Sequence, residues 1–379
     1  MADDGPAGPT PGLPTDWYFD AGHHRRELQQ IWYRNWIYAG RASGLDQPGA
    51  FRAVDVGDQH VLVVRDGQGV LRAFHNTCRH RGAALCRESE GRFAGAVIVC
   101  PYHAWVYSLA GELLRTSSDS RGVKLQKRDF HLYEMAVTEW SGFVFVALTG
   151  APPPFAASFD VPLGRLAAWD LDRLVLGHVF SRTMRCNWKI FWENYNECLH
   201  CPGVHPQLSQ LVPIFGRGLL EERDDPHWRD HANDPDPQYK GGLRRGAASW
   251  SVDGQPGPVQ FAGISGSDRQ LGHVYQTSLP SMFIVGHTDY VRVVRLAPLQ
   301  PELTELRVEY LFAPEALAHP QFDLHNVVDF ANRVLGEDCE VCELNQRGLH
   351  AVAHARGVLM PEEYALAQLH AWIRAELQR

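Results

Sequence analysis

The chain contains Cys78-Arg79-His80 and, after nineteen further residues, Cys100-Pro101-Tyr102-His103. Each segment supplies one thiol and one imidazole, so two loops together offer Cys78, His80, Cys100 and His103. Thiolates bind iron strongly, and neutral imidazoles leave a bound cluster with less negative charge. The four residues therefore predict a [2Fe–2S] cluster in which the cysteines bind one iron and the histidines bind the other. A zinc site is the alternative, although zinc sites more often pair C-x2-C with H-x3-5-H.

A second set of metal-ligating residues lies downstream, in the segment from Trp188 to His205. The pattern predicts a helix over 188–200, which would place Glu197 and His200 on one face. Pro202-Gly203 would end this helix and turn the chain, so that His205 comes back towards His200. Two histidines and one carboxylate on one face of Fe(II) leave positions open for O2 and substrate. On spacing alone, a chance pair among 19 histidines explains the segment equally well.

The third ligand of this second site is expected from the acidic segment 337–343. We prefer Asp338, because a helix would group it with Val341, Cys342 and Asn345 on a partly apolar face, where a carboxylate needs a metal or a partner. A solvated acidic helix face is the plainer interpretation. A rival hypothesis is a four-cysteine zinc site formed by two C-x2-C pairs: Cys198 with Cys201 and Cys339 with Cys342. Both pairs fall in helical patterns far apart in sequence, which is unlike the closely spaced turns of zinc ribbons.

Length and charge set limits on the class of protein. The 379 residues are sufficient for two domains, and the net charge of −8 gives no reason to expect nucleic acid or an anionic membrane as a partner. No stretch approaches eighteen apolar residues, so no membrane-spanning helix is expected. The first fifteen residues look like a disordered tail and not a signal peptide. With only eight cysteines, we expect a reducing cytoplasm and free or metal-bound thiols.

The pattern along the chain divides it further. Residues 16–39 contain an amphipathic helix, which is expected over 21–36 and packed on the domain formed by residues 151–379. Short β runs fill 40–150, with a hairpin turn at 66–69, and indicate an all-β domain that presents both cluster loops. Consecutive prolines at 152–154 mark a boundary. Residues 151–379 read as α+β, with four strand-like runs after residue 272, closing helices, and a long irregular region over 215–270 that is typical of a lid or of disorder.

These segments together resemble the Rieske non-haem iron oxygenases (ring-hydroxylating oxygenase α subunits). The resemblance rests on CRHRGA from residue 78, CPYHAWVYSLAGEL from 100, NWKIFWENYNECLHCPGVHP from 187 and EDCEVCELNQRGL from 337. It implies an α+β fold with an all-β Rieske [2Fe–2S] domain and a helix-grip catalytic domain, in which an antiparallel sheet wraps around a long helix. It also implies a head-to-tail homotrimer, with Asp338 as an iron ligand and Glu197 bridging His200 to the cluster ligand His103. Glu197 is a mild departure, since many relatives carry Asp there.

The resemblance implies a cofactor set and partners as well. The expected cofactors are the [2Fe–2S] cluster and a mononuclear Fe(II), with O2 as co-substrate. Electrons would come from NAD(P)H through a separate flavin/iron–sulfur reductase, because this chain has no G-x-G-x-x-G after a strand. The expected reaction is hydroxylation of a C–H bond in a small molecule.

The sequence of the segment that starts at residue 187 looks most like that of the branch that oxidises quaternary ammonium compounds such as glycine betaine, carnitine or stachydrine. N-demethylation of a trimethylammonium group would need an aromatic cage. Its candidate members are Trp192, Tyr195, Tyr275, Phe283 and Tyr290. Arg292 or Arg295 could hold a substrate carboxylate, although an exposed strand arginine is the commoner case. Hydroxylation of an aromatic ring, an electron carrier without oxygenase turnover and a structural zinc protein are the alternatives.

Overall fold

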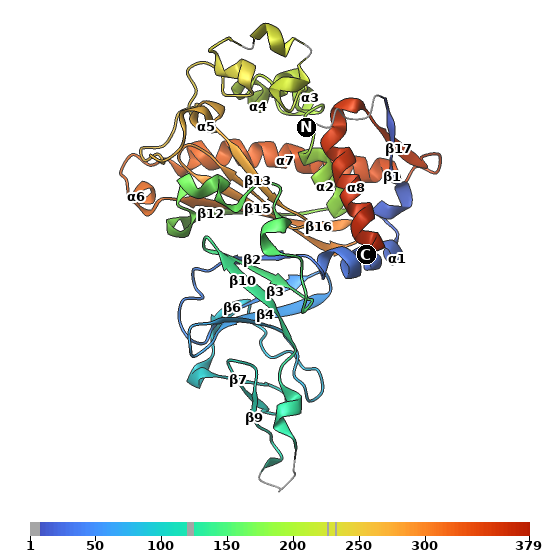
Figure 1. Ribbon diagram of the computed structural model, residues 1–379, viewed down its shortest axis with the longest axis vertical. Helices are drawn as coiled ribbons and strands as arrows, with labels where there is room; N and C mark the ends of the chain where they lie inside the picture. The colour runs from blue at the N-terminus through green and yellow to red at the C-terminus, as the bar shows by residue number, and fades with distance from the viewer. Residues whose placement is uncertain (1–7, 120–124, 226, 232) are drawn as a thin grey trace. The chain divides into compact units, whose positions relative to one another are not determined.

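The computed structural model describes residues 8–379 except 120–124, 226 and 232 (Figure 1). The chain divides into two compact units, each described below by itself. The smaller unit comprises 32–158 and 279–281. The larger unit comprises the N-terminal residues up to 31 together with 159–278 and 282–379.

The smaller unit is built on an antiparallel sheet of seven strands. In spatial order these are β2 (Ile37–Arg41), β11 (Phe143–Ala147), β10 (Glu134–Trp140), β5 (Leu71–His75), β4 (Gln59–Arg65), β3 (Ala50–Val56) and β6 (Glu90–Arg92). The predicted turn between β4 and β5 is present: the Asp66 carboxylate accepts hydrogen bonds from the backbone N–H groups of Gln68 and Val70, each at 2.9 Å. Such side-chain-to-backbone bonds favour tight turns, and this one fixes the register of the hairpin.

A second sheet in the smaller unit carries one of the two cysteine loops. Its strands are β7 (Val97–Val99), β8 (Val106–Ser108) and β9 (Leu113–Arg115). The loop from Cys100 to Trp105 connects β7 to β8, and the loop that holds Cys78 follows β5. Both cysteines belong to a buried apolar cluster with Phe74 and Tyr107. The core of the unit therefore extends directly beneath the two loops.

The larger unit combines a five-stranded antiparallel sheet with a long helix (Figure 1). The strands, in spatial order, are β12 (Val175–Met184), β16 (Leu303–Phe312), β15 (Val291–Gln300), β14 (Met282–Gly286) and β13 (Val274–Ser278). Helix α7 (Leu324–Leu349) lies along the sheet and is capped by Asp323, whose side chain accepts from the N–H groups of His325 and Asn326. None of the described helices, α7 included, is long and apolar enough to cross a membrane.

Shorter elements surround this sheet and helix. They are α1 (Ala21–Glu27), α2 (Trp188–Tyr195), α3 (Cys201–Val204), α4 (Pro206–Leu211), α5 (Gly266–Leu271), α6 (Pro314–Leu317) and α8 (Tyr364–Gln378), with β1 (Thr10–Pro14) paired to β17 (Arg356–Leu359). The antiparallel sheet and the long helix agree with the predicted α+β class. The strands after residue 272 and the two closing helices lie close to their predicted positions.

Three local predictions are wrong. Residues 10–14 of the predicted disordered tail form β1, whose partner strand β17 lies far away in sequence, while residues 1–7 lie outside the described part of the chain. The helix predicted over 21–36 is α-helical only to Glu27 and continues as a π-helical turn over Leu28–Trp32. The irregular region 215–270 contains four short 3-10 helices and α5 instead of a uniform loop.

Candidate metal centres

The two cysteine loops of the smaller unit are shaped by tight backbone turns. The N–H of Gly82 donates to the carbonyl of Cys78 at 2.9 Å, and the N–H of Ala104 donates to the carbonyl of Cys100 at 3.1 Å. Both cysteines are buried, at 3% and 2% exposure. The rings of His80 and His103 lie 4.7 Å apart. The structure thus brings each loop's histidine beside the other's, as a shared cluster requires.

Tyr107 also belongs to this site, although no sequence pattern pointed to it. Its hydroxyl lies 3.2 Å from the Cys78 sulfur and accepts a hydrogen bond from the N–H of Arg79 at 3.1 Å. The ring of His80 stacks on that of Trp105, with centroids 4.9 Å apart. A hydroxyl directed at a thiolate stabilises its negative charge and so tunes the potential of a bound cluster.

In the larger unit, His200, His205 and Asp338 converge. The Oδ1 atom of Asp338 lies 2.9 Å from Nε2 of His205 and 3.5 Å from Nε2 of His200. The two imidazole rings are 5.2 Å apart and nearly perpendicular. Asp338 comes from α7, whereas both histidines come from the chain that follows α2. Two segments far apart in sequence thereby meet at one point.

The helix predicted over 188–200 is too long, because α2 ends at Tyr195. Glu197 and His200 therefore lie in a turn and not on one helix face. They meet all the same, since the Glu197 carboxylate accepts hydrogen bonds from the backbone N–H groups of Leu199 and His200 and from the His200 ring. Pro202 does not end a helix but stands in the first turn of a new one, α3.

A carboxylate binds each of the two imidazole rings at the nitrogen that faces away from Asp338. The Nδ1 atom of His200 donates to Glu197 at 2.5 Å, and Nδ1 of His205 donates to Glu337 at 2.8 Å. Because Nδ1 is the donor in each ring, Nε2 is the atom left to face Asp338. Such carboxylate–histidine pairs fix the tautomer and raise the basicity of metal-ligating imidazoles. Glu337 belongs to the acidic segment 337–343, and its sequence context does not distinguish its role from that of its neighbours.

The titration of these groups follows from their contacts. Burial opposes charge on both rings, yet hydrogen bonds to Asp338 and Glu197 raise the pKa of His200 to about 9. Burial likewise acts to lower the pKa of His205, but hydrogen bonds to Asp338 and Glu337 outweigh it, so this pKa is also raised. Burial acts to raise the pKa of Asp338, but hydrogen bonds from both histidines hold it below its ordinary value. These protons would be exchanged for a cation, because ligating imidazoles must be neutral.

The donor chemistry fits a divalent iron ion. Two imidazole nitrogens and a carboxylate oxygen are the 2-His-1-carboxylate set of non-haem Fe(II) sites. The sulfur of Cys201 also lies within 4.8 Å of ligand atoms of both histidines, but it is bonded to Cys198 in a disulfide and offers no thiolate. This disulfide contradicts the prediction of free or metal-bound cysteines at 198 and 201. It also excludes the four-cysteine zinc site, since Cys339 and Cys342 keep free thiols on α7.

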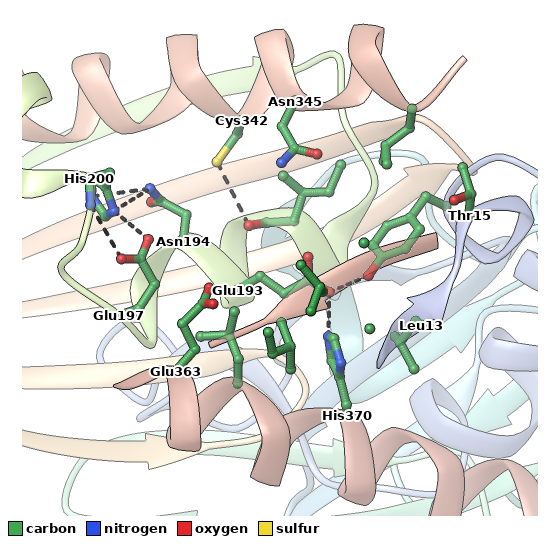
Figure 2. A pocket seen from close by; sticks show the side chains of 18 of the residues that line it. Leu13, Thr15, Glu193, Asn194, Glu197, His200, Cys342, Asn345, Glu363 and His370 are labelled. Atoms are coloured by element: carbon green, nitrogen blue, oxygen red, sulfur yellow. Dashed lines mark hydrogen bonds and ion pairs between the residues drawn. The ribbon is translucent and has the colours of Figure 1, made fainter. Parts of the chain in front are cut away.

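A cavity of about 360 Å³ in the larger unit reaches the outer side of this site (Figure 2). Glu193, Asn194, Glu197, His200 and Glu363 are among its lining residues. Figure 2 shows the side chains of Asn194 and Glu197 directed at the His200 ring, and the Asn194 amide lies 3.2 Å from Nε2. The cavity therefore gives access to the Glu197 side of the ring.

The predicted aromatic cage is only partly assembled. Four of its five members contact one another: Tyr195 stacks on Phe283 with centroids 3.8 Å apart, and Trp192 and Tyr275 lie within 6 Å of this pair. Tyr290 is elsewhere and stacks on His287. Two rings 3.8 Å apart leave no room for a cation between them. Any cation must therefore lie against the outer faces or edges of the group.

Comparison with known proteins agrees with both centres. The family model of the Rieske [2Fe-2S] domain matches residues 35–127, and that of the ring hydroxylating alpha subunit (catalytic domain) matches residues 163–379. The chain belongs to the ring-hydroxylating, Rieske-type oxygenases. As an oxygenase of this family it is an enzyme that uses a [2Fe–2S] cluster, non-haem iron and O2. The alternatives of a simple electron carrier and of a structural zinc protein are thereby set aside.

The similar proteins extend over most of the chain. A glycine betaine monooxygenase oxygenase subunit of Chromohalobacter salexigens is 30% identical, covering 91% of this chain and 81% of the relative. A chloroplastic choline monooxygenase of Beta vulgaris is 26% identical over 96% of this chain and 77% of the relative. A solved quaternary ammonium Rieske monooxygenase, described as giving insights into carnitine oxidation and inter-subunit electron transfer, superposes with a TM-score of 0.72 at 21% identity, covering 98% of this chain and 96% of that chain. This last likeness establishes the fold.

Proposed function

We propose that this oxygenase hydroxylates an N-methyl group of a quaternary ammonium compound. The observation that carries the proposal is the 30% identity to a glycine betaine monooxygenase subunit over 91% of the chain. The N-methyl compound, O2, two electrons and two protons give the N-hydroxymethyl compound and water. The hydroxymethyl group then leaves as formaldehyde, and the nitrogen keeps the electron pair of the broken C–N bond while one proton is released.

The roles of the residues follow from their positions. We assign Cys78, His80, Cys100 and His103 to the cluster, and His200, His205 and Asp338 to the mononuclear iron. When bound, these groups supply an electron store and a centre that activates O2. The protein orients the ligands: Glu337 holds the His205 ring, Glu197 holds the His200 ring, and Tyr107 donates towards Cys78.

We infer the electron path and the partners from the same contacts. Glu197 lines the cavity and binds His200, so its carboxylate is placed to bridge His200 to His103 of a neighbouring copy in a homotrimer. The inter-subunit electron transfer described for the similar solved protein supports this arrangement. A separate NAD(P)H-dependent flavin/iron–sulfur reductase would supply the electrons. A reducing, cytoplasmic compartment is favoured by six free cysteines among the described residues, although the Cys198–Cys201 disulfide counts against it.

The test is formaldehyde release under O2 with a chemical reductant, using anaerobically iron-loaded protein. The panel comprises glycine betaine, carnitine, choline and two aromatic acids. We expect formaldehyde, together with the demethylated amine in equal amount, from at least one N-methyl compound. A hydroxylated aromatic product without formaldehyde would keep the oxygenase family and overturn the proposed substrate class.

A further inference from the structure

The guanidinium of Arg292, on β15, is buried in the larger unit without an acidic partner. The residue is 4% exposed, and among the described residues none forms a hydrogen bond or ion pair with its side chain. The guanidinium carbon lies 5.9 Å from the centroid of the Trp250 ring. A buried cation without a counter-ion loses hydration that nothing replaces. The position is therefore suited to an anion that the chain does not supply.

Arg292 lies on the sheet face that α7 covers. Antiparallel pairing aligns Tyr275, Val285, Arg292 and Tyr310 in one row across four strands, so their side chains point to the same face. The Tyr310 hydroxyl donates to Asn332 of α7 at 2.7 Å, which identifies the face. Asp338, the candidate iron ligand, is on the same helix. Arg292 and the iron site thus share the space between sheet and helix.

Two tyrosines are close enough to both the guanidinium and the candidate iron ligand to feel the charge of each. Burial raises the pKa of Tyr275 to about 12, and this phenol experiences both the positive charge of Arg292 and the negative charge of Asp338. Tyr195, whose ring lies 5.7 Å from that of Tyr275, experiences both charges too. Its buried hydroxyl and Nδ1 of His273 have no hydrogen-bond partner among the residues that the structure describes. The surroundings of the two charges thus have unused polar groups and aromatic faces.

We propose that Arg292 binds the carboxylate of the substrate, which makes this enzyme specific for betaines. The inference rests on the proposed function and narrows it. Betaines carry a quaternary nitrogen and a carboxylate, whereas choline carries the same nitrogen with an alcohol. The planar guanidinium grips a carboxylate through two parallel hydrogen bonds, while the aromatic faces of Tyr195 and Tyr275 receive the methylated nitrogen. Choline would leave the buried guanidinium unpaired.

Isothermal titration of the iron-loaded protein with glycine betaine, carnitine, choline and benzoate measures this preference without turnover. We expect at least one betaine to bind about 100-fold more tightly than choline, because a site built for a charged group rejects an analogue that lacks it. Arg292→Met should lose that difference, and Arg292→Lys should keep part of it. The matched control is Arg295→Met on the same strand, since Arg295 points to the opposite face and pairs with Glu305 at 3.4 Å. This control should keep the wild-type preference.

Folding of the larger unit, which contains both arginines, is verified for each variant by its mononuclear iron content and by its urea unfolding. Equal binding of betaines and choline by wild type, or unchanged betaine affinity in Arg292→Met, would overturn the role of Arg292. Release of formaldehyde from choline but from no betaine would overturn it as well, while leaving the proposed N-methyl hydroxylation intact. If only benzoate binds, and does so through Arg292, the carboxylate site stands and the proposed function fails.

Discussion

At the scale of single residues, one carboxylate oxygen organises the catalytic centre. Oδ1 of Asp338 faces the Nε2 atoms of His205 and His200, and a second carboxylate fixes each ring from behind. This arrangement separates two kinds of residue: those that would touch iron and those that orient the ligands. Substitutions of the two kinds should have different consequences.

His200→Ala should abolish product formation while leaving the cluster spectrum intact, because the cluster residues lie in the other unit. The measurement is iron content and visible absorption beside formaldehyde release. His325→Ala is the control, since that side chain is 82% exposed at the start of α7. Loss of the cluster spectrum in His200→Ala would show that the division into two metal centres is wrong.

Glu337→Gln should weaken mononuclear iron binding by roughly 10–100-fold without removing a ligand, because loss of an orienting carboxylate loosens the His205 ring. Competition with a chelator measures the affinity. Glu340→Gln on the exposed face of the same helix should behave as wild type. Equal iron affinity in Glu337→Gln and Glu340→Gln would show that Glu337 does not orient the His205 ring.

At the scale of elements, sequence patterns predicted the positions of strands better than the ends of helices. The alternation over 305–312 and the apolar runs before it located four strands of the sheet. The end of α2 could not be predicted, because Asn196 and Glu197 are compatible with a helix and the turn depends on the Glu197 carboxylate binding Leu199 and His200. The burial of Arg292 was also missed: apolar neighbours on both sides conceal which face of β15 is covered.

Helix α1 is held to α2 by a buried ion pair, which gives a prediction at this scale. Nζ of Lys189 lies 2.6 Å from Glu27, and neither side chain is exposed. Lys189→Met should cost roughly 3–5 kcal/mol of unfolding free energy, because it removes the ammonium partner of the buried Glu27 carboxylate and leaves it only its contacts with His23 and Trp188. Urea unfolding measures the loss. The double variant Glu27→Gln/Lys189→Met should lose less than the sum of the singles, and strict additivity would contradict the pairing.

At the scale of the whole molecule, two buried histidines should make stability depend on pH. Burial, with the nearby charge of Arg292, lowers the pKa of His273 to about 4, and burial lowers that of His287 well below its ordinary value. In the unfolded chain both histidines titrate near pH 6.5. Between pH 6.5 and 4 the unfolded state therefore binds more protons than the folded state, and the free energy of unfolding decreases as the pH falls. His273 alone contributes roughly 3 kcal/mol to this fall.

The prediction is tested by comparing unfolding free energies of wild type and His273→Gln at pH 7 and pH 5. The variant should lose less stability between the two values, whereas His227→Gln, whose side chain is 76% exposed, should follow wild type. A variant as sensitive to acid as wild type would show that His273 already binds a proton in the folded protein at pH 5.

The two-domain family architecture was predictable as a whole because its ligand motifs are local in sequence. Cys78 to His103 and Glu197 to His205 each span fewer than thirty residues. What the sequence could not supply were contacts between distant segments, such as β1 with β17 and His205 with Glu337. The proposed substrate site also joins distant segments, since Tyr195 belongs to α2, Tyr275 to β13 and Arg292 to β15.

The account is tested most directly by a single turnover. Protein reduced at the cluster, loaded with Fe(II) and freed of excess reductant is mixed with glycine betaine and O2, and cluster oxidation and formaldehyde are followed together. We predict that the wild-type cluster is oxidised as formaldehyde appears, and that Glu197→Gln keeps a reduced cluster and forms none. Cluster oxidation without any formaldehyde, or normal turnover in Glu197→Gln, would contradict the account.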